Sequence, residues 1–357
     1  MGRRPSNDGG NSGYATLTNF QVNRSGGIPA RYRTVTMGEE VLEEKVGARD
    51  LHGLVEEFFR SSFSTDNALI TEAVKRMLAA GGKRLRPRIT LLAAEACGGD
   101  ALQHLHLAAY LELIHVATLI HDDVVDNALL RRGVNATAVD YGNRVSVLAG
   151  DYLFAWIFDN VTRRYPAPVP NILSATLAEI CDGEVLQLTA LGNFELPMEA
   201  YVEVARKKTG SLFAAAAQCG AIMGGGNAVQ VAALREFGRA FGIAFQINDD
   251  LLDVTADERA LGKPAANDLA ERKTTLPLIA ALARGNGDFR SRVRRFYDGD
   301  SNAAIPEILQ GIDRAGGLDA TRAEIARFIA EAKAALEPIA SGAAKNGLIE
   351  LTDALHA

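Results

Sequence analysis

Two short groups of aspartates have the residue type and spacing of a site for divalent cations. In chain order they are Asp122, Asp123, Asp126, Asp249, Asp250 and Asp253. Each group follows the pattern D-D-x-x-D, so on a helix its first and last carboxylates lie on one face, about 6 Å apart, with the second beside them. Mg²⁺ in proteins is commonly held by a few carboxylates together with substrate phosphates. The spacing therefore predicts two acidic helix faces able to hold Mg²⁺ and a phosphorylated substrate.

An acidic triplet can also be an ordinary solvated helix face, and two observations argue against that interpretation. Both groups are embedded in apolar sequence, with Leu-Ile-His before the first and Leu-Leu within the second, and a buried charge needs a partner or a metal. The pattern also closes two separate apolar segments, although like charges at this spacing destabilise a helix by roughly 0.2–0.5 kcal/mol per pair. The acidic groups are therefore candidate metal ligands.

Basic residues accompany the acidic groups at several points of the chain. They are Lys83, Arg84, Arg86, Arg131, Arg132, Lys208, Lys263 and Lys273. The first three belong to GGKRLRP, where two glycines end one expected helix and another begins, and both helix N-termini and cationic side chains favour phosphate. A single surface cation is more often only solvated. Together the set could neutralise one metal-bound anion and a second anion that carries no metal.

One histidine has a position that relates it to the first acidic group. His115 lies seven residues before Asp122, which on a helix places it about 20° off the same stripe and ~10 Å away. A lone histidine in an apolar helix is more often a core residue with a satisfied ring. With its basic and acidic neighbours, His115 is expected to face the same cavity as the aspartates.

The elements that must position these residues are helical. The chain has 357 residues, 48% of them hydrophobic, and its Val, Ile and Thr residues form no long alternating runs, which favours helix over strand. We expect an all-α fold, a single large antiparallel helical bundle around a central cavity, over residues 46–357, and a disordered tail over the Gly- and Ser-rich residues 1–45. The expected helices cover 67–80, 101–126, 144–160, 169–191, 198–208, 211–223, 228–255, 268–284, 303–314, 319–341 and 345–355, with Gly224–Gly226 as a helix–helix turn.

Composition excludes several other classes of protein. The net charge of −6 argues against general nucleic-acid binding, which needs a basic face. Cys97, Cys181 and Cys219 lie far apart without the spacing of metal ligands, so reduced thiols and a cytoplasmic location are expected. No apolar run is long enough for a membrane span, and no apolar signal-peptide core is present at the N-terminus.

Seven segments in a fixed order carry a resemblance to a known family. They are GGKRLRP, HVATLIHDDVVDNALLRRG, LAGDYLFA, GEVLQL, KKTGSLF, FQINDDLLDV and GKPAANDLAERKTTLP. Over roughly residues 50–345 the sequence resembles the trans-isoprenyl diphosphate synthases, and its motif style is closest to the medium- and long-chain polyprenyl synthases. The resemblance implies a bundle of long helices around a deep cavity, and a homodimer.

The resemblance also implies roles for individual residues. The six aspartates would hold three Mg²⁺ ions on an allylic diphosphate, which would be contacted as well by Arg131, Lys208, Gln246 and Lys263. Isopentenyl diphosphate would be bound by Lys83, Arg86, His115 and Arg132. Thr209 and Phe245 would line the site near the reacting carbons. Lys208 and Lys263 are counted with the aspartates as catalytic, and Lys273 is counted among the substrate-binding residues.

The implied reaction is a condensation that needs no protein nucleophile. The allylic C–O bond would ionise, the double bond of isopentenyl diphosphate would attack the cation, and a proton would be lost to the departing pyrophosphate. Ala117, five residues before Asp122, stands where short-chain relatives carry a bulky aromatic, and Thr118 and Ile114 would form the adjacent tunnel wall. We therefore expect a product of C20 or longer, which would itself partition into membranes. The alternative is that Ala117 only permits close helix packing.

Three residues depart from the family pattern, and two other functions compete. Ala266 and Arg272 stand where glycines are usual, and Asn127 stands where an acid is frequent; these changes bear on loop conformation and remove no ligand. A class I terpene cyclase shares the first acidic motif, but it normally carries a different second motif and lacks the GGKRLRP site. A non-catalytic subunit of a heteromeric prenyl synthase usually loses one aspartate motif, and both are intact here.

Overall fold

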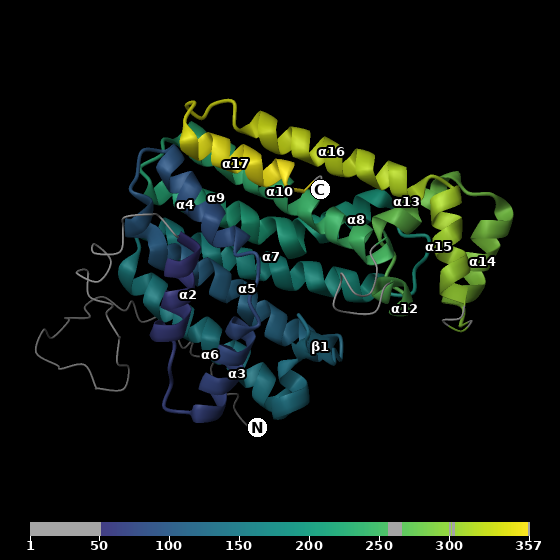
Figure 1. Cartoon of the computed structure of the whole chain (residues 1–357), viewed down its shortest axis with the longest axis horizontal. Helices are drawn as coiled ribbons and strands as arrows, with labels where there is room; N and C mark the ends of the chain where they lie inside the picture. The colour runs from purple at the N-terminus through teal and green to yellow at the C-terminus, as the bar shows by residue number, and fades with distance from the viewer. Residues whose placement is uncertain (1–50, 256–265, 300, 302–303, 356–357) are drawn as a thin grey trace, which may run out of the picture. The chain divides into compact units, whose positions relative to one another are not determined.

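The computed structural model describes residues 51–255, 266–299, 301 and 304–355, all of which belong to one compact unit, Thr36–Ala357 (Figure 1). The tail expected over residues 1–45 lies outside the described residues, as does Lys263. The described part is helical throughout, apart from loops and one pair of two-residue strands. The expected all-α fold is therefore confirmed.

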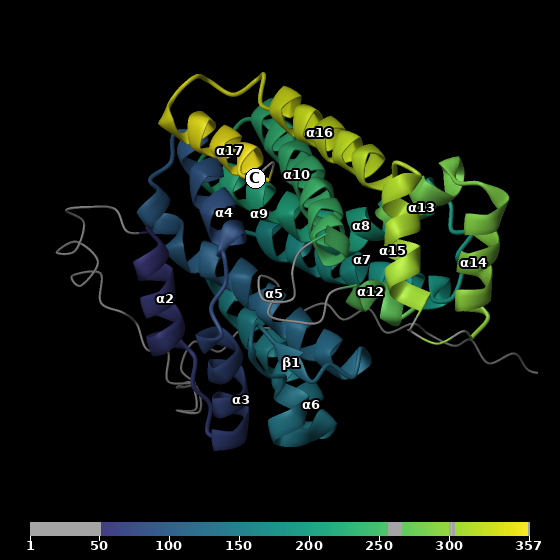
Figure 2. The ribbon, with the colours of Figure 1, turned by 45° about the vertical axis from the view of Figure 1, so that its right-hand side comes forward.

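Two long helices carry the acidic groups. α5 (Leu105–Val125) packs against α4 (Leu85–Ala96) and α6 (Thr137–Arg164). α10 (Ala228–Thr255) packs against α9 (Ser211–Met223) and α16 (Gly317–Ala335). α5 is hydrophobic on every side and is almost entirely buried along its first four turns, as a helix at the centre of a bundle must be. Each acidic group lies in the last turns of its helix, so packing of the two helices fixes where the carboxylates stand (Figure 2).

The remaining elements complete the bundle around α5 and α10. In chain order they are α2 (Leu51–Ser62), α3 (Ala68–Ala79), the 3₁₀ turn η1 (Ala101–His104), the strands β1 (Leu130–Arg131) and β2 (Val134–Asn135), α7 (Pro168–Ala190), α8 (Met198–Ala205), the π turn η2 (Arg206–Gly210), α9 (Ser211–Met223), α12 (Asn267–Ala270), α13 (Leu276–Arg284), α14 (Gly287–Tyr297), α15 (Ile305–Arg314), α16 (Gly317–Ala335) and α17 (Ala343–Asp353). The expected turn at Gly224–Gly226 separates α9 from α10. α6 is kinked at Gly142.

Several boundaries differ from the sequence-based expectation. The expected break between 198–208 and 211–223 is wrong, because Gly210 keeps helical dihedrals and a π turn joins α8 to α9 without interruption. The single helix expected over 268–284 is also wrong, because Arg272 has φ 60° and ends the helical path before α13 begins. α14 was not anticipated, since four arginines mask its apolar spacing at Phe289, Val293 and Phe296.

The hydrophobic core has two parts. The larger cluster contains residues from the helices α2 through α10, together with α16 and α17. The smaller cluster contains residues from α12 through α15, among them Leu269, Leu278, Phe296, Ile308 and Ile312. The smaller cluster holds α12 and the loop after it against the bundle, beside the end of α10 (Figures 1 and 2). None of the helices in the described part of the chain combines the length and apolar character needed to span a bilayer.

Candidate functional site

The first acidic group is followed by a tight β-hairpin that returns a cation to it. β1 pairs with β2 antiparallel, and the two turn residues between them, Arg132 and Gly133, have φ values of 51° and 77°, as a type I′ turn requires. The strand directs Arg131 back, so that its Nε and Nη2 lie 2.7 and 2.5 Å from Oδ1 of Asp123. The hairpin therefore fixes one cation on the middle aspartate of the group.

Neutral donors hold the middle aspartate of the second group. Tyr201, from α8, donates its hydroxyl to Oδ2 of Asp250 at 2.6 Å, and Nε2 of Gln246 donates to Oδ1 at 2.8 Å. Thr209 in turn donates to Oε1 of Gln246 at 2.6 Å. Both oxygens of this buried carboxylate therefore have fixed donors on the protein side.

Residues 266–268 lie against the end of α10. The backbone N–H of Ala266 donates to the carbonyl of Asp253 at 2.8 Å, and the N–H of Asp268 donates to its side-chain Oδ2 at 3.1 Å. Ala266 has φ 56°, a left-handed conformation that glycine adopts more easily. Arg272, with φ 60°, is held there because its guanidinium donates to the Phe296 carbonyl at 3.1 Å and stacks on that ring.

A lysine that follows α12 contacts the end of the first acidic group. Nζ of Lys273 lies 3.4 Å from Oδ2 of Asp126 and 2.6 Å from Oε2 of Glu271. Burial by itself lowers the pKa of the Lys273 ammonium, but Glu271 and Asp126 outweigh it, so the pKa is raised. Because Lys273 also lines a cavity together with Asp249 and Asp250 of α10, the ends of α5 and α10 lie on either side of this lysine.

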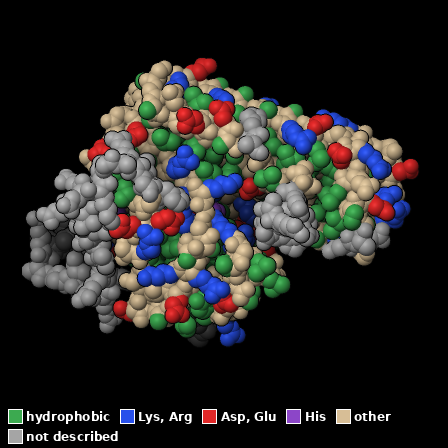
Figure 3. Space-filling view, viewed as in Figure 1, with side chains coloured by type: hydrophobic (Ala, Val, Ile, Leu, Met, Phe, Trp, Pro, Cys, Tyr) green, Lys and Arg blue, Asp and Glu red, His purple; other side chains and the backbone are tan. Residues whose placement is uncertain are grey.

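A cavity of about 200 Å³ opens between these elements. Its lining combines apolar residues of α7 and α8 with acidic and basic groups, among them Tyr201, Lys208, Gln246, Asp249, Asp250, Asp268 and Lys273. Asp249 is exposed to it, whereas Asp250 and Asp253 are buried. Figure 3 shows Lys and Arg side chains gathered around a hollow in the middle of one face.

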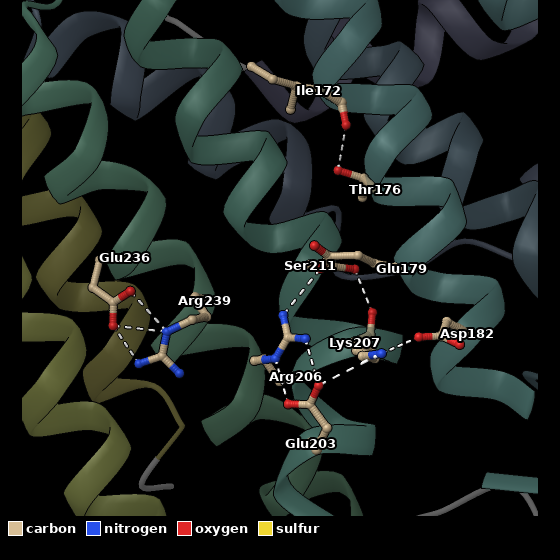
Figure 4. Close-up of polar contacts among 10 residues, drawn as sticks. All are labelled: Ile172, Thr176, Glu179, Asp182, Glu203, Arg206, Lys207, Ser211, Glu236 and Arg239. Atoms are coloured by element: carbon tan, nitrogen blue, oxygen red, sulfur yellow. Dashed lines mark hydrogen bonds and ion pairs between the residues drawn. The ribbon is translucent and has the colours of Figure 1, made fainter. Parts of the chain in front are cut away.

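The π turn divides four consecutive polar residues between two sides of the bundle. Arg206 pairs with Glu203 of α8 at 2.7 Å, and Lys207 pairs with Asp182 of α7 (Figure 4). On the other side, Lys208 lines the cavity with its Nζ 2.5 Å from Oε2 of Glu184. Thr209 also points inward, to Gln246. Such π turns are frequent at functional sites, and this one directs Lys208 and Thr209 together toward the acidic groups.

Gly183 makes the close approach of α7 to this turn possible. A Cβ at Gly183 would lie 2.7 Å from the backbone N of Lys208 and 2.8 Å from Cβ of Lys207. Contacts that short are excluded unless the backbone moves, so any side chain here would displace Lys208. The glycine therefore has a packing role inside the expected GEVLQL motif.

A second set of cations lies between α4, α5 and the hairpin. Lys83 and Arg86 stack over aromatic rings, with Nζ of Lys83 5.5 Å from the centre of Phe245 and the Arg86 guanidinium 4.3 Å from that of Phe213. Burial lowers the pKa of Arg86 to about 10. His115 belongs to the same group, because burial first, and then its arginine neighbours, hold the pKa of its imidazole well below the usual value.

Arg132 of the hairpin reaches this second set of cations because Gly82 has no side chain in its path. Arg132 donates to the carbonyl of Gly81, and a Cβ on the neighbouring Gly82 would lie 2.7 Å from Nη1 of Arg132. Gly82 has φ 151°. The two glycines therefore do more than end α3: they allow Arg132 to lie against the chain beside Arg86.

Arg84, which the sequence groups with Lys83 and Arg86, has a different environment. It adopts φ 48° at the start of α4 and points into the core, with only 2% of its surface exposed. Its Nε donates to Glu56 at 2.6 Å, and Nη1 donates to Glu112 at 3.2 Å. Two of the three cations in GGKRLRP therefore stack over aromatic rings of α9 and α10, and the third joins helices.

The carboxylates have the character of cation ligands. Burial raises the pKa of Asp122 to about 6, with Lys208 opposing the shift and Glu184 and Asp126 adding to it. Burial likewise raises the pKa values of Asp123 and Asp250. Oδ2 of Asp123 is buried and accepts no hydrogen bond from the described residues. Among those residues, no group of three or more His, Cys, Asp or Glu side chains is already assembled to hold an ion. An oxygen-only donor set with an orphaned buried oxygen fits a hard divalent cation.

Sequence reasoning missed three residues of the site. They are Tyr201 on Asp250, Glu184 on Lys208 and Asp268 in the cavity lining, and each comes from a different element from those that carry the acidic groups. Glu184 belongs to GEVLQL and Asp268 to GKPAANDLAERK. Both motifs are therefore part of the sequence-based prediction, which does not single out these two residues within them. Tyr201 belongs to no motif, and only the packing of α8 reveals it.

The three expected tunnel residues lie along α5. Ala117 and Ile114 are completely buried in the larger core, and Thr118 is half-buried, with its hydroxyl donating to the His115 carbonyl at 2.8 Å.

A larger cavity of about 490 Å³ lies on the other side of the π turn, between α7, α9 and α10. None of the residues predicted for the site lines it. Two of its arginines are engaged by neighbouring acids: Arg206 pairs with Glu203 and Glu179, and Arg239 pairs with Glu236 (Figure 4). The volume of a cavity therefore does not identify the functional site, whereas the convergence of aspartates and basic residues does.

The fold and the site define an all-helical protein in which two acidic helix ends and two sets of cations converge. The model of the family described as Polyprenyl synthetase matches residues 67–312. The chain is 37% identical over 306 residues to a short chain isoprenyl diphosphate synthase of Methanothermobacter thermautotrophicus (84% of this chain, 94% of the relative) and 36% identical over 305 residues to an octaprenyl diphosphate synthase of Escherichia coli (85% and 94%).

The solved structures agree with these relatives. A crystal structure of a polyprenyl synthase from Caulobacter crescentus, complexed with calcium and isoprenyl diphosphate, matches with a TM-score of 0.81 and 36% identity over 89% of this chain and 96% of that one. The chain belongs to the polyprenyl synthetase family. It is a polyprenyl diphosphate synthase, a prenyltransferase, which confirms the family and the enzyme class expected from the sequence.

Proposed function

We propose that this synthase condenses isopentenyl diphosphate with an allylic diphosphate in the presence of Mg²⁺, makes a trans-polyprenyl diphosphate of C20 or longer, and releases pyrophosphate. The observation that carries the proposal is that Lys273, which contacts Asp126 of the first acidic group, lines one cavity with Asp249 and Asp250 of the second. A separate cation set, Lys83, Arg86 and Arg132, with the imidazole of His115 beside it, supports a second diphosphate that carries no metal.

In this proposal each group of residues has a distinct task. Asp122, Asp126 and Asp249 offer oxygens to cations at the cavity, and Lys208, Arg131 and Lys273 surround the leaving diphosphate. Lys263, which lies outside the described residues, is proposed for the same task on the resemblance alone. Bound Mg²⁺ supplies Lewis-acid stabilisation of the leaving diphosphate.

The carbon chemistry proceeds without a protein nucleophile. The allylic C–O bond breaks, the C–C bond to isopentenyl diphosphate forms, and the proton released passes to the departing pyrophosphate. Thr209 and Phe245 line the region where the carbons meet. Apolar walls protect the cation by excluding water, and we assign the paired rings of Phe213 and Phe245 to these walls.

The direct test uses the purified full chain with Mg²⁺, labelled isopentenyl diphosphate, and farnesyl or geranylgeranyl diphosphate as primer. We expect a ladder of dephosphorylated products that ends at one length and disappears with EDTA. A folded chain that incorporates no label, with or without Mg²⁺, would instead favour a subunit that needs a catalytic partner. A cyclic hydrocarbon made from the primer alone would favour a cyclase.

The product length is proposed to depend on Ala117. Because Ala117 is fully buried on α5, below the acidic group, an aromatic side chain there would block a growing chain. Ala117→Phe should shorten the product, and Ala117→Val should have an intermediate effect. An unchanged ladder in a folded Ala117→Phe variant would show that Ala117 serves only helix packing.

A second copy of the chain is the partner we propose. α6 and α7 carry exposed apolar side chains that include Leu148 (60% exposed) and Val185 (56%), and helix faces of this kind are buried in homodimers. Leu148→Asp combined with Val185→Asp should convert a dimer to a monomer in analytical ultracentrifugation. Leu69→Asp on α3, at a comparably exposed leucine (53%), should not. A wild-type monomer would contradict the proposal.

A cytoplasmic location is also proposed. Cys97, Cys181 and Cys219 are all free thiols, as expected in a reducing compartment. Fractionation of cells that produce the chain would test this.

A further inference from the structure

A buried carboxylate with no assigned task lies behind the second cation set. Glu112 is on α5, one helical turn before His115, and only 2% of its surface is exposed. Its Oε1 accepts from Nη1 of Arg84 at 3.2 Å. Its Oε2 is buried and accepts no hydrogen bond from any residue that the structure describes. A buried charge that is only half satisfied is costly, so its position needs an explanation.

The arginine on one side of Glu112 is fixed in place by three other contacts. Besides Glu112, Arg84 donates to Glu56 at 2.6 Å and to the Leu78 carbonyl at 3.0 Å, and its guanidinium lies 4.9 Å from the centre of the Phe59 ring. Glu56 and Phe59 belong to α2, and Leu78 to α3. Arg84 therefore anchors Oε1 of Glu112 to the N-terminal helices and is not itself free to meet a substrate.

The two arginines proposed to bind isopentenyl diphosphate lie within the electrostatic reach of Glu112, and Arg86 is on α4, two residues after Arg84, where α4 packs against α5. Burial lowers the pKa values of both Arg86 and Arg132, and the charge of Glu112 acts against that shift in each. Nε of Arg86 is buried and, within the described residues, donates to no acceptor. Glu112 is thus a counter-charge common to guanidinium groups that would otherwise repel one another.

We propose that Glu112 is a positioning residue for the isopentenyl diphosphate subsite, which holds Arg86 and Arg132 in the arrangement that a diphosphate requires while it remains bonded to Arg84. The inference rests on the proposed function, because it assumes that the second cation set binds isopentenyl diphosphate. Glu112 itself does not touch the substrate, since a carboxylate and a diphosphate repel. Its effect is exerted through the two arginines.

Three roles for Glu112 predict different results for Glu112→Gln, which keeps the shape and removes the charge. Positioning predicts weaker binding of isopentenyl diphosphate. A purely electrostatic role predicts tighter binding, because a negative charge near the diphosphate is lost. A purely structural role predicts a lower thermal midpoint with unchanged binding. Binding and stability must therefore be measured on the same variant.

The experiment compares Glu112→Gln, Glu112→Asp and Glu56→Gln in the full chain. Glu56 is the matched control, because it bonds to the same Arg84 from a more exposed position (25% against 2%) and is not among the charges that act on Arg86 or Arg132. Binding of isopentenyl diphosphate is measured by calorimetry without Mg²⁺, and KM is measured for both substrates with it.

We expect Glu112→Gln to raise Kd and KM for isopentenyl diphosphate about tenfold, the size of effect that a small misplacement of binding groups produces. KM for the allylic substrate should stay within about twofold, and Glu112→Asp should recover part of the loss. Glu56→Gln should lower the thermal midpoint without changing KM. An unchanged or lower Kd in folded Glu112→Gln would overturn the inference. Failure of the wild-type chain to bind isopentenyl diphosphate at all would overturn the proposed function instead.

Discussion

The two acidic ends share the spacing D-D-x-x-D but have different surroundings. At the end of α5, Asp123 is held by a cation, Arg131, which a short hairpin supplies from eight residues further along the chain. At the end of α10, Asp250 is held by two neutral donors, Tyr201 and Gln246. One middle aspartate is therefore paired with a positive charge, whereas the other has only neutral donors, and burial and the nearby Asp268 raise its pKa well above the usual value.

This difference separates two tasks within one sequence pattern. In each group the middle carboxylate is buried and engaged by the protein, while the first carboxylate, Asp122 or Asp249, is the more accessible. Buried donors orient a carboxylate and leave its remaining lone pairs for a cation. We infer that the middle aspartates set the geometry and that the first ones meet the cations directly.

The largest effect should come from the first aspartate of either group. Asp122→Asn and Asp249→Asn should each lower kcat by about a thousandfold, since each removes a charged ligand where the leaving group develops its charge. Steady-state kinetics at saturating Mg²⁺ measure this. Asp319→Asn, at an exposed aspartate on α16 (85% exposed), is the matched control. Near-normal kcat in either site variant would contradict the division of tasks.

The next effect should distinguish the second acidic end from the first. Tyr201→Phe removes only the hydroxyl that donates to Asp250, so the Mg²⁺ concentration for half-maximal rate should rise about tenfold or more. The ring stays packed, and the thermal midpoint reports whether the fold is intact. An unchanged Mg²⁺ requirement would mean that Gln246 alone is enough to orient Asp250.

A matching change tests the first acidic end. Arg131→Lys keeps the charge but cannot supply the paired donors that reach Asp123, so KM for the allylic diphosphate should rise about tenfold. The Mg²⁺ requirement should change less than in Tyr201→Phe. If both variants altered the same kinetic parameter to the same extent, the two ends would be equivalent.

The smallest effects should appear in the loop after α10. Ala266 is left-handed without side-chain support, so Ala266→Gly should raise the free energy of unfolding by about 1 kcal/mol. Arg272 is also left-handed but is held by the Phe296 carbonyl and ring, so Arg272→Gly should lower that free energy. Chemical denaturation measures both. Equal and positive changes would mean that the Arg272 contacts contribute little.

The residue that follows the first acidic group, at the end of α5, explains why a substitution to glycine is not needed there. Asn127 directly follows the first acidic group and has φ 50°, and asparagine tolerates this conformation better than alanine does. All three departures from the family pattern, Asn127, Ala266 and Arg272, are therefore left-handed residues at the acidic ends. The sequence indicated a question of loop conformation, and the backbone dihedrals give the physical reason.

Much of the fold could be predicted because helices are encoded locally. The apolar spacing of α5 and α10, and the glycines at 224–226, define elements whose periodicity is visible within a few turns. The prediction was wrong where a local signal competes with packing. Gly210 resembles a break and is helical, and the arginines of α14 conceal a helix that is stabilised by its contact with α15.

What the sequence by itself determined about this protein is the chemistry it can offer: two carboxylate groups, the cations of GGKRLRP, RRG and KKTG, and an all-helical frame. Only the tertiary structure decided how that chemistry is divided. It turned Arg84 away from Lys83 and Arg86 into the core, brought Tyr201 to Asp250, and placed Glu112 behind the arginines. The physical reason is that residue type and helical phase are local properties. Burial and hydrogen-bond partners, in contrast, depend on helices that are distant along the chain.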